Sequence, residues 1–288
     1  MRLGGARESG NVEDRRGIGR GGLAVGGGLG TIAVVVLALL FGVDPGQLTG
    51  GGGAGPAEGP PQSARPGGPA GQPRNDEQTR FIRQVLGTTE DVWGDIFKRN
   101  GSTYREPTLQ IFERVADTAC GRAGSSVGPF YCPGDQKVYI DLSFYDELRS
   151  RFRAPGDFAQ AYVIAHEVGH HVQNLLGTSD KVTQLQRRAR DEAQSNQLSV
   201  RLELQADCYA GVWGYYAKQK NMLDPGDLEE ALGAASAIGD DRLQRESQGY
   251  VVPDSFTHGS SEQRMRWFRA GFDSGDARRC DTFSSRGM

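Results

Sequence analysis

The sequence lacks the charge excess that would point to a nucleic-acid partner. Lysine and arginine number 33 against 36 aspartate and glutamate residues, and the formal net charge is only -3. Acidic and basic residues are interspersed along the chain, a pattern typical of a solvated surface. We therefore expect no nucleic acid among the partners.

Cysteine is scarce, and its four occurrences form no Cys-x-x-Cys pair, which argues against a cysteine-rich structural zinc site. In an oxidising compartment an even count predicts two disulfides. Cys120 and Cys132 flank a short loop of glycine, serine and proline, so we expect them to pair. Cys208 would then pair with Cys280 and tie a central helix to the C-terminal tail, which is one of three connectivities.

Charge is absent from one long stretch near the N-terminus. No charged residue occurs over residues 21–43, and residues 31–41 are continuously apolar apart from Thr31. About 20 apolar residues cross the hydrocarbon core, so we predict one transmembrane helix over residues 21–43. The alternative is a cleaved signal peptide, but a polar and charged segment precedes the run and no clear small-x-small cleavage site follows it.

The arginines around this run predict its orientation. None follows the run until Arg65, whereas five precede it: Arg2, Arg7, Arg15, Arg16 and Arg20. Positive charge is retained on the cytoplasmic side of a membrane. We therefore expect a single-pass protein in which residues 1–20 form a cytoplasmic tail and the folded C-terminal domain lies outside the cytoplasm.

Composition also predicts the remaining boundaries. Glycine and proline make up more than half of residues 44–73, so residues 44–74 cannot bury a core and are expected to form a disordered linker. Residues 75–288 remain, enough for one enzyme-sized domain. Asn75 or Asp76 can cap its first helix.

The folded part shows the patterns of both helices and strands. Apolar residues recur at helical spacing over residues 81–97, with Gly87 as an interruption. Residues 108–112 and 137–142 alternate like short half-buried strands, and residues 155–220 are predominantly helical. These patterns predict an α+β fold, in which a small antiparallel sheet packs on helices and its edge can lie alongside an extended chain.

One helix is delimited at both ends and contains three of the four histidines. Pro155 and Gly156 precede it, Asp157 can cap it, and Gln160 three residues later would complete a capping box. Gly177 lies where a left-handed residue is expected after a helix.

Inside this helix lies the sequence His166-Glu-x-x-His170. Residues four apart share a helix face, so both imidazoles can bind one metal ion. Glu167 lies beside them, close enough to act on a metal-bound water without occupying a coordination position. Chance would not explain the apolar flanks and the helix boundaries, so we predict a zinc site. His171 points about 100° away from His170, which favours a supporting or surface role over ligation.

A catalytic zinc site needs a third protein ligand and one open position. Glu203 is the best candidate, on a second apolar-periodic helix where Glu203 and Asp207 share a face. Glu203 can bind zinc while Asp207 accepts the free N–H of a ligand histidine and fixes its orientation. The alternative is a solvated pair of carboxylates, which the aromatic and alanine-rich surroundings argue against.

His-Glu-x-x-His followed by Glu-x-x-x-Asp resembles the gluzincin class of metallopeptidases. A wider string of motifs resembles the putative neutral zinc metallopeptidase family of bacteria (YpfJ-like proteins) over approximately residues 75–285. The string includes Thr89-Glu-Asp-Val-Trp, Gly128-Pro-Phe-Tyr-Cys-Pro, Ala165-His-Glu-Val-Gly-His-His-Val-Gln and Leu204-Gln-Ala-Asp-Cys-Tyr-Ala-Gly. The resemblance implies a zincin-like domain with His166, His170 and Glu203 as zinc ligands and Glu167 as the catalytic residue.

The fourth histidine, His258, precedes Arg264 near the C-terminus. Related membrane-associated gluzincins carry a histidine and an arginine at similar spacing, so the resemblance implies a catalytic role for His258. It could stabilise the oxyanion of a tetrahedral intermediate, and Arg264 could pair with a buried carboxylate or with substrate. In the alternative, Ser260 or Ser261 caps a final helix and His258 is idle in the loop.

Together these residues predict a membrane-anchored zinc metallopeptidase with a protein or peptide substrate. Zinc lowers the pKa of its bound water, and Glu167 takes the proton and passes it to the leaving amine. Two alternatives stay open. One is a zinc-containing binding module without proteolysis, which would have no reason to keep Glu167 beside an open metal position. The other is a hydrolase of an ester or amide in cell-wall material. The oligomeric state is not determined by the sequence.

Overall fold

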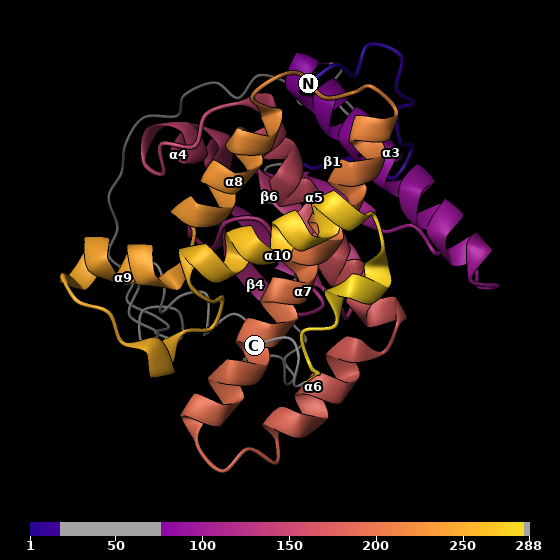
Figure 1. Ribbon diagram of the computed structural model, residues 1–288. Coiled ribbons are helices and arrows are strands. Elements are labelled where there is room, and N and C mark those ends of the chain that lie inside the picture. The colour runs from indigo at the N-terminus through magenta and orange to yellow at the C-terminus, as the bar shows by residue number, and fades with distance from the viewer. Residues whose placement is uncertain (18–75, 285–288) are drawn as a thin grey trace, which may run out of the picture.

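The computed structural model describes residues 1–17 and 76–284 of the chain. These residues form a mixed sheet and eight α-helices (Figure 1). The sheet has the order β1-β2-β6-β5, with strands Val12–Asp14, Thr108–Phe112, Lys137–Asp141 and Phe130–Cys132. β1 and β6 run parallel to β2, and β5 runs antiparallel to β6. A separate antiparallel hairpin joins β3 (Val115–Thr118) to β4 (Gly121–Gly124).

The α+β class is confirmed, but the expectation of a purely antiparallel sheet is wrong for the larger sheet. Parallel neighbours need a long crossover, and the segment between β2 and β6 supplies one. It contains the β3–β4 hairpin, β5 and a 3-10 turn, η1 (Ser125–Val127). The alternation of apolar and polar residues along a strand does not reveal whether the neighbouring strand runs parallel or antiparallel to it.

The helices supply most of the core. In chain order they are α3 (Glu77–Arg99), α4 (Ser143–Ser150), α5 (Asp157–Leu175), α6 (Thr178–Gln186), α7 (Glu192–Gln219), α8 (Asp227–Ala237), α9 (Asp240–Gln248) and α10 (Ser261–Ser274). Two further 3-10 turns are η2 (Pro253–Ser255) and η3 (Ala277–Cys280). α10 packs closely on α7, and Gly271 permits this because it has no side chain. A Cβ atom at this position would lie only 1.9 Å from the carbonyl oxygen of Cys208.

α5 begins at Asp157 and ends as predicted, with Gly177 in the left-handed region at φ 72°. The predicted capping box is wrong. Asp157 instead accepts two hydrogen bonds of 2.6 Å from the Met1 ammonium, and the amide of Phe158 donates to Glu230 Oε2 at 3.0 Å. Residues distant in sequence therefore bind the start of this helix: Glu230 accepts a hydrogen bond from a first-turn backbone amide, and the Met1 ammonium pairs with Asp157.

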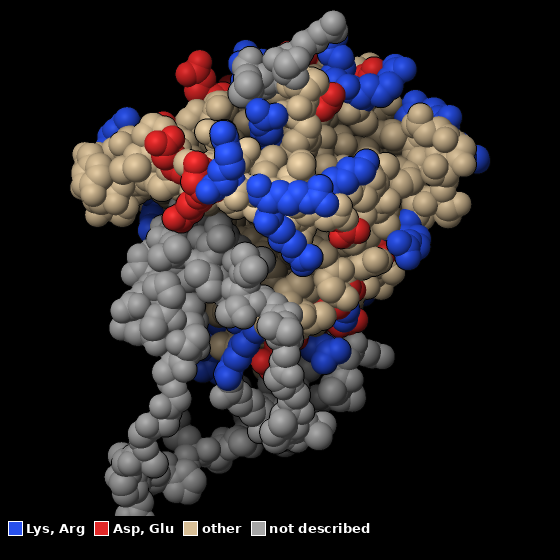
Figure 2. Space-filling model, turned by 90° about the horizontal axis from the view of Figure 1, so that it is seen from below, with Lys and Arg blue, Asp and Glu red and all other residues tan. Residues whose placement is uncertain are grey.

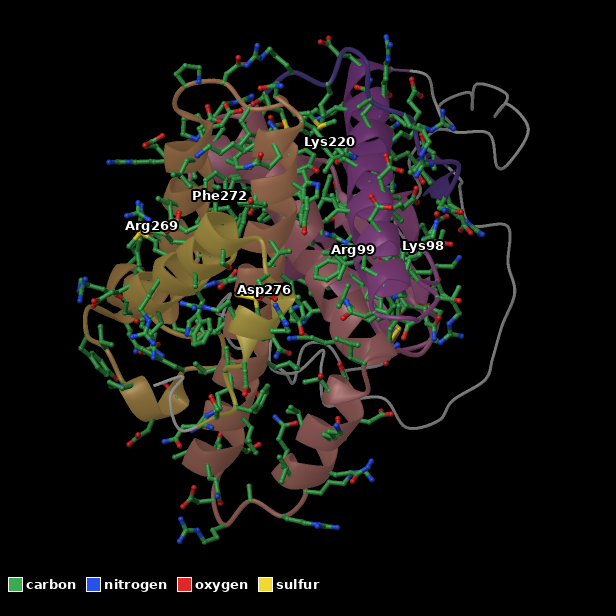
Figure 3. All side chains as sticks on the ribbon, turned by 45° about the vertical axis from the view of Figure 1, so that its right-hand side comes forward. Lys98, Arg99, Lys220, Arg269, Phe272 and Asp276 are labelled. Atoms are coloured by element: carbon green, nitrogen blue, oxygen red, sulfur yellow. A yellow bond between two sulfur atoms is a disulfide. The ribbon has the colours of Figure 1, made fainter. Side chains whose placement is uncertain are left out.

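α3 is capped by Asp76, whose side chain accepts a 2.7 Å hydrogen bond from the Thr79 amide. The interruption expected at Gly87 does not occur. A Cβ atom there would lie 2.5 Å from the carbonyl oxygen of Arg7, so glycine allows the N-terminal segment to approach the helix. Lys98 and Arg99 lie in the last turn (Figure 3), where positive charge stabilises the terminal carbonyls.

Residues 1–17 pack on this domain instead of forming a separate tail. They contribute β1, and their Leu3 and Val12 side chains are buried. Three of the arginines that predicted a cytoplasmic N-terminus pair with acidic residues beyond residue 75: Arg2 with Asp224 at 2.9 Å, Arg7 with Glu90 at 2.7 Å and Arg16 with Asp76 at 3.0 Å. The folded unit therefore includes a segment that lies before the predicted boundary at residue 75.

Both disulfides have the predicted connectivity, Cys120–Cys132 and Cys208–Cys280. The second joins α7 to η3, as expected for a link between a central helix and the C-terminal tail. The predicted transmembrane helix over 21–43 and linker over 44–74 lie outside the described residues. Within residues 1–17 and 76–284, no helix is long and apolar enough to cross a membrane.

Charge on the surface agrees with the near-neutral composition. On the face shown in Figure 2, several lysine and arginine side chains gather near the middle, and aspartate and glutamate side chains lie around them.

Candidate metal centre

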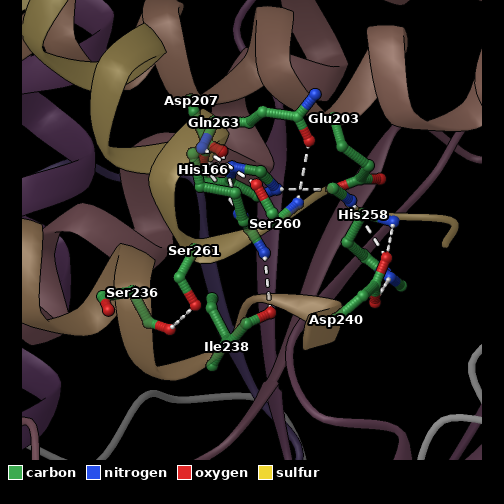
Figure 4. Close-up of polar contacts among 12 residues, drawn as sticks. His166, Glu203, Asp207, Ser236, Ile238, Asp240, His258, Ser260, Ser261 and Gln263 are labelled. Carbon is green, nitrogen blue, oxygen red and sulfur yellow. Dashed lines mark hydrogen bonds and ion pairs between the residues drawn. The ribbon is translucent and has the colours of Figure 1, made fainter. Parts of the chain in front are cut away.

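α5 and α7 pack together and bring the two predicted motifs to one site. Glu203 Oε2 lies 3.1 Å from His166 Nε2, and Glu203 Oε1 lies 3.3 Å from His170 Nε2. All three side chains line a cleft of about 640 Å³. The structure therefore brings the three predicted ligands together (Figure 4, His166 and Glu203).

The spacing and chemistry of these atoms fit zinc. Ligand bonds of about 2.0–2.1 Å at tetrahedral angles place neighbouring donor atoms about 3.3 Å apart. The nitrogen–oxygen separations are 3.1 Å from His166 Nε2 to Glu203 Oε2 and 3.3 Å from His170 Nε2 to Glu203 Oε1, and one ligand atom from each of the three residues lies within 4.8 Å of the other two. Two imidazoles and one carboxylate form a donor set of catalytic zinc sites, in which a fourth position stays open.

Asp207 orients His166 from the buried side. Its Oδ1 lies 2.8 Å from His166 Nδ1, so Nδ1–H donates to the carboxylate and Nε2 faces Glu203. The same carboxylate accepts hydrogen bonds from Tyr162 Oη at 2.5 Å and from Arg264 Nε at 2.9 Å. Arg264 thus pairs with a buried carboxylate, one of the two roles expected for it.

The buried carboxylates make the site favourable for a cation. Burial raises the pKa of Asp207, but Arg264 and His166 outweigh it and lower this pKa to about 2. Burial opposes ionisation of Glu203 too, yet His170 and His258 hold its pKa well below the usual value. Burial lowers the pKa of His166, whereas Asp207 and Glu203 raise it to about 10. A metal ion binding this imidazole therefore displaces a proton.

Gln173 orients the second histidine and was not predicted as a site residue. Its Oε1 lies 2.9 Å from His170 Nδ1, and its Nε2 donates to the carbonyl oxygen of Leu202 at 2.7 Å. That second bond sets the amide so that its oxygen faces the imidazole, which leaves His170 Nε2 directed at Glu203. The only sequence signal was its position, three residues after His170 on the same helix face.

Glu167 lies beside the ligands, largely buried at 7% exposure, and lines the same cleft. It is not part of the cluster of three converging ligand atoms. Burial raises the pKa of its carboxyl group, and His166 and His170 oppose that shift. A carboxylate with a raised pKa is suited to take up a proton and release it again.

His171 is buried and connects α5 to the sheet, so the supporting role expected for it fits the structure and a surface role does not. Its Nε2 lies 2.6 Å from the carbonyl oxygen of Arg105, so Nε2 carries the proton. Its Nδ1 therefore accepts from Tyr131 Oη at 3.0 Å. Tyr131 belongs to β5, which places this edge strand against the helix that carries the ligands.

Asp240 holds His258 at the cleft (Figure 4). Asp240 Oδ2 accepts the backbone amides of Thr257, His258 and Gly259 at 2.8, 2.6 and 3.0 Å. Asp240 Oδ1 lies 3.3 Å from His258 Nδ1. His258 is therefore held in place beside the ligands, and sequence reasoning missed Asp240 because no motif links it to the histidine. Ser260 also caps α10, as the alternative interpretation expected.

An α+β domain with His-Glu-x-x-His and Glu-x-x-x-Asp on two packed helices is typical of gluzincin metallopeptidases. This chain belongs to the putative neutral zinc metallopeptidase family, whose family model matches residues 1–283. The match includes residues 1–17, which the structure places on the domain.

Two relatives illustrate the family. The chain is 53% identical to Uncharacterized protein YpfJ of Escherichia coli strain K12, over 98% of this chain and 99% of that protein. It is 42% identical to Uncharacterized protein Rv2575 of Mycobacterium tuberculosis, over 86% of this chain and 85% of that protein. No solved structure matches the chain.

Proposed function

We propose that this protein is a zinc metallopeptidase that hydrolyses peptide bonds in a protein or peptide substrate. The observation that carries the proposal is the convergence of His166, His170 and Glu203, with Glu167 beside them in the same cleft. Bound zinc would supply a Lewis acid that acidifies a water molecule and polarises the scissile carbonyl.

The chain's own residues supply the proton transfers and the orientation. Glu167 accepts a proton from the attacking water and returns it to the leaving amine, and its raised pKa favours the uptake. His258, which Asp240 holds in place, donates a hydrogen bond to the oxyanion. Asp207 and Gln173 keep the two ligand imidazoles in their orientations.

β5 offers a place for the substrate backbone. It forms one edge of the four-stranded sheet, and Phe130 and Tyr131 from this strand line the cleft. An extended peptide can add to such an edge through main-chain hydrogen bonds. This arrangement supports a peptide over a compact small-molecule substrate.

The test is the substitution Glu167→Gln. It is expected to keep the fold and bound zinc but to lose nearly all hydrolysis, because the base is removed while the ligands stay. Metal analysis, circular dichroism and a peptide-cleavage assay measure the three properties. Glu113→Gln is the matched control, since Glu113 is exposed and outside the cleft. Substantial residual activity in Glu167→Gln would contradict the assigned mechanism.

We also propose that the domain acts in an oxidising compartment, attached to a membrane. Two disulfides support the first part, because such bonds persist outside reducing cytoplasm. The anchor rests on the apolar run over residues 21–43 alone. Peptide mapping of the unreduced native protein would decide the compartment, since four free thiols would argue for the cytoplasm.

A further inference from the structure

The cleft around the metal centre has a polar part and an apolar part. The polar part is lined by Arg187, directly after α6, and by hydroxyl and amide side chains from α6 and the first half of α7: Ser179, Thr183, Gln186, Ser195, Asn196 and Ser199. The apolar part is lined by side chains from α4, α5, α9 and the segments next to them: Val127, Phe144, Phe152, Val163, Ile238 and Leu243. In Figure 1, α6 lies well apart from α4 and α9.

The apolar part begins directly beside the reacting groups. Val163 lies four residues before Glu167 on α5, so the two side chains share one face of that helix. Val163 is also one turn before the ligand His166. A substrate side chain in the apolar part therefore belongs to a residue close to the bond that is cleaved.

The charge of Arg264 is already neutralised by Asp207. Arg264 lines the cleft, but its guanidinium donates to Asp207 at 2.9 Å and to the carbonyl oxygen of Ile238 at 3.3 Å. The six apolar lining side chains carry no charge. A charged substrate side chain would lose its hydration there without gaining a partner.

From these observations we propose that the apolar part of the cleft, here called the apolar subsite, binds a bulky aliphatic or aromatic side chain adjacent to the scissile bond. The subsite makes the protein selective for peptides with such a residue. This inference rests on the proposed peptidase function and defines its substrate class.

A pair of dipeptide hydroxamates tests the subsite without relying on turnover. The hydroxamate chelates zinc, and the adjacent side chain is isobutyl in one probe and methyl in the other. Calorimetry on the zinc-loaded full-length protein is expected to show tighter binding of the isobutyl probe by about tenfold or more, since each methylene in an apolar pocket contributes a large factor.

Leu243→Gln is expected to bring the affinity ratio of the two probes close to one. Leu185→Gln is the matched control and should keep the parent ratio, because Leu185 is exposed on α6 and does not line the cleft. A general loss of stability would weaken both probes alike and leave the ratio unchanged, so a parent-like ratio in Leu243→Gln counts against the subsite.

The outcomes separate the two proposals. Equal affinities of the parent protein for both probes would overturn the apolar subsite, even if peptides are cleaved. Selective binding of the isobutyl probe that Leu243→Gln abolishes would support the subsite. If the same zinc-loaded protein cleaved no peptide in a mixed-sequence library, the peptidase function would fail while the subsite stood.

Discussion

Asp207 connects three buried side chains of the site. It accepts hydrogen bonds from His166, Tyr162 and Arg264, and it is fully buried. Arg264 is only 2% exposed, so its charge relies on Asp207 for compensation. The sequence predicted that Asp207 accepts a hydrogen bond from a ligand imidazole. The structure shows that it also forms an ion pair with Arg264.

Asp207→Ala is therefore expected to lower stability as well as zinc binding. Breaking a buried ion pair from one side costs about 3–5 kcal/mol, because the other charge stays buried. Loss of the contact to His166 is expected to reduce zinc affinity or activity by about 10–100-fold. Urea unfolding and zinc titration measure the two effects. Asp207→Asn controls for shape, and unfolding of Asp207→Ala at the parent midpoint would show that the pair contributes no stability.

Substitutions of Glu203 and His258 test which of the two residues binds the metal and which acts on the substrate. Glu203→Ala should greatly weaken zinc binding, because it removes the carboxylate that both ligand imidazoles face. His258→Ala should keep zinc bound and lower turnover alone. Metal titration beside a cleavage assay measures both. If His258→Ala lost zinc while Glu203→Ala kept it, the site would be a three-histidine type and the gluzincin assignment wrong.

At the scale of secondary structure, His171 ties the edge strand β5 to α5. Its two ring nitrogens bond Tyr131 Oη and the carbonyl oxygen of Arg105, so the ring links α5 both to the strand and to the segment that leads into β2. Burial lowers the pKa of His171, which keeps the ring neutral and preserves this pattern of donor and acceptor. The position of the proposed substrate-binding edge therefore depends on one side chain beside the ligands.

His171→Phe is expected to raise KM for peptides while zinc affinity stays near that of the parent. The ring volume is kept, but Tyr131 and the Arg105 carbonyl each lose a hydrogen bond, at about 1–3 kcal/mol for a buried group left unpaired. Steady-state kinetics and zinc titration separate the effects. Tyr131→Phe, which removes only the hydroxyl, should give a smaller change in KM, and a large loss of zinc in His171→Phe would place the ring in the metal site instead.

At the scale of the whole molecule, residues 1–17 constrain any membrane topology. They pair with β2 and form ion pairs with the domain, so the two parts lie on the same side of a membrane while they are packed together. A single crossing over residues 21–43 would separate them. The predicted cytoplasmic N-terminus with an external domain would require these contacts to open, and three of the five arginines behind that prediction, Arg2, Arg7 and Arg16, have acidic partners in the domain.

Gly87→Ala tests this packing. Alanine favours a helix over glycine by about 1 kcal/mol, but the added Cβ would meet the Arg7 carbonyl oxygen at 2.5 Å, a backbone atom that can yield only if residues 7–9 move. We expect a net loss of stability and faster proteolysis of the N-terminal segment. Gly94→Ala on the same helix is the control, because open space surrounds its added Cβ and it should stabilise. Stabilisation by both substitutions would show that residues 1–17 do not dock.

The sequence by itself determined the parts of the site that depend on one helix. His166 and His170 share a face because they are four residues apart on α5, and the same rule joins Glu203 to Asp207 on α7. Helix geometry is local, so the spacing was sufficient to predict both pairs. The short loop between Cys120 and Cys132 likewise predicted their disulfide, and the remaining pair followed.

The tertiary structure alone decided which distant groups meet. β1 joins β2 across more than ninety residues, Asp240 at the start of α9 lies beside His258 in the segment before α10, and Gln173 is oriented by a carbonyl of α7. A three-residue strand and a single carboxylate carry no periodic pattern, so their partners depend on how the helices pack. That packing also set the parallel direction of β1, β2 and β6, because alternation within a strand records which face is buried and not which way its neighbour runs.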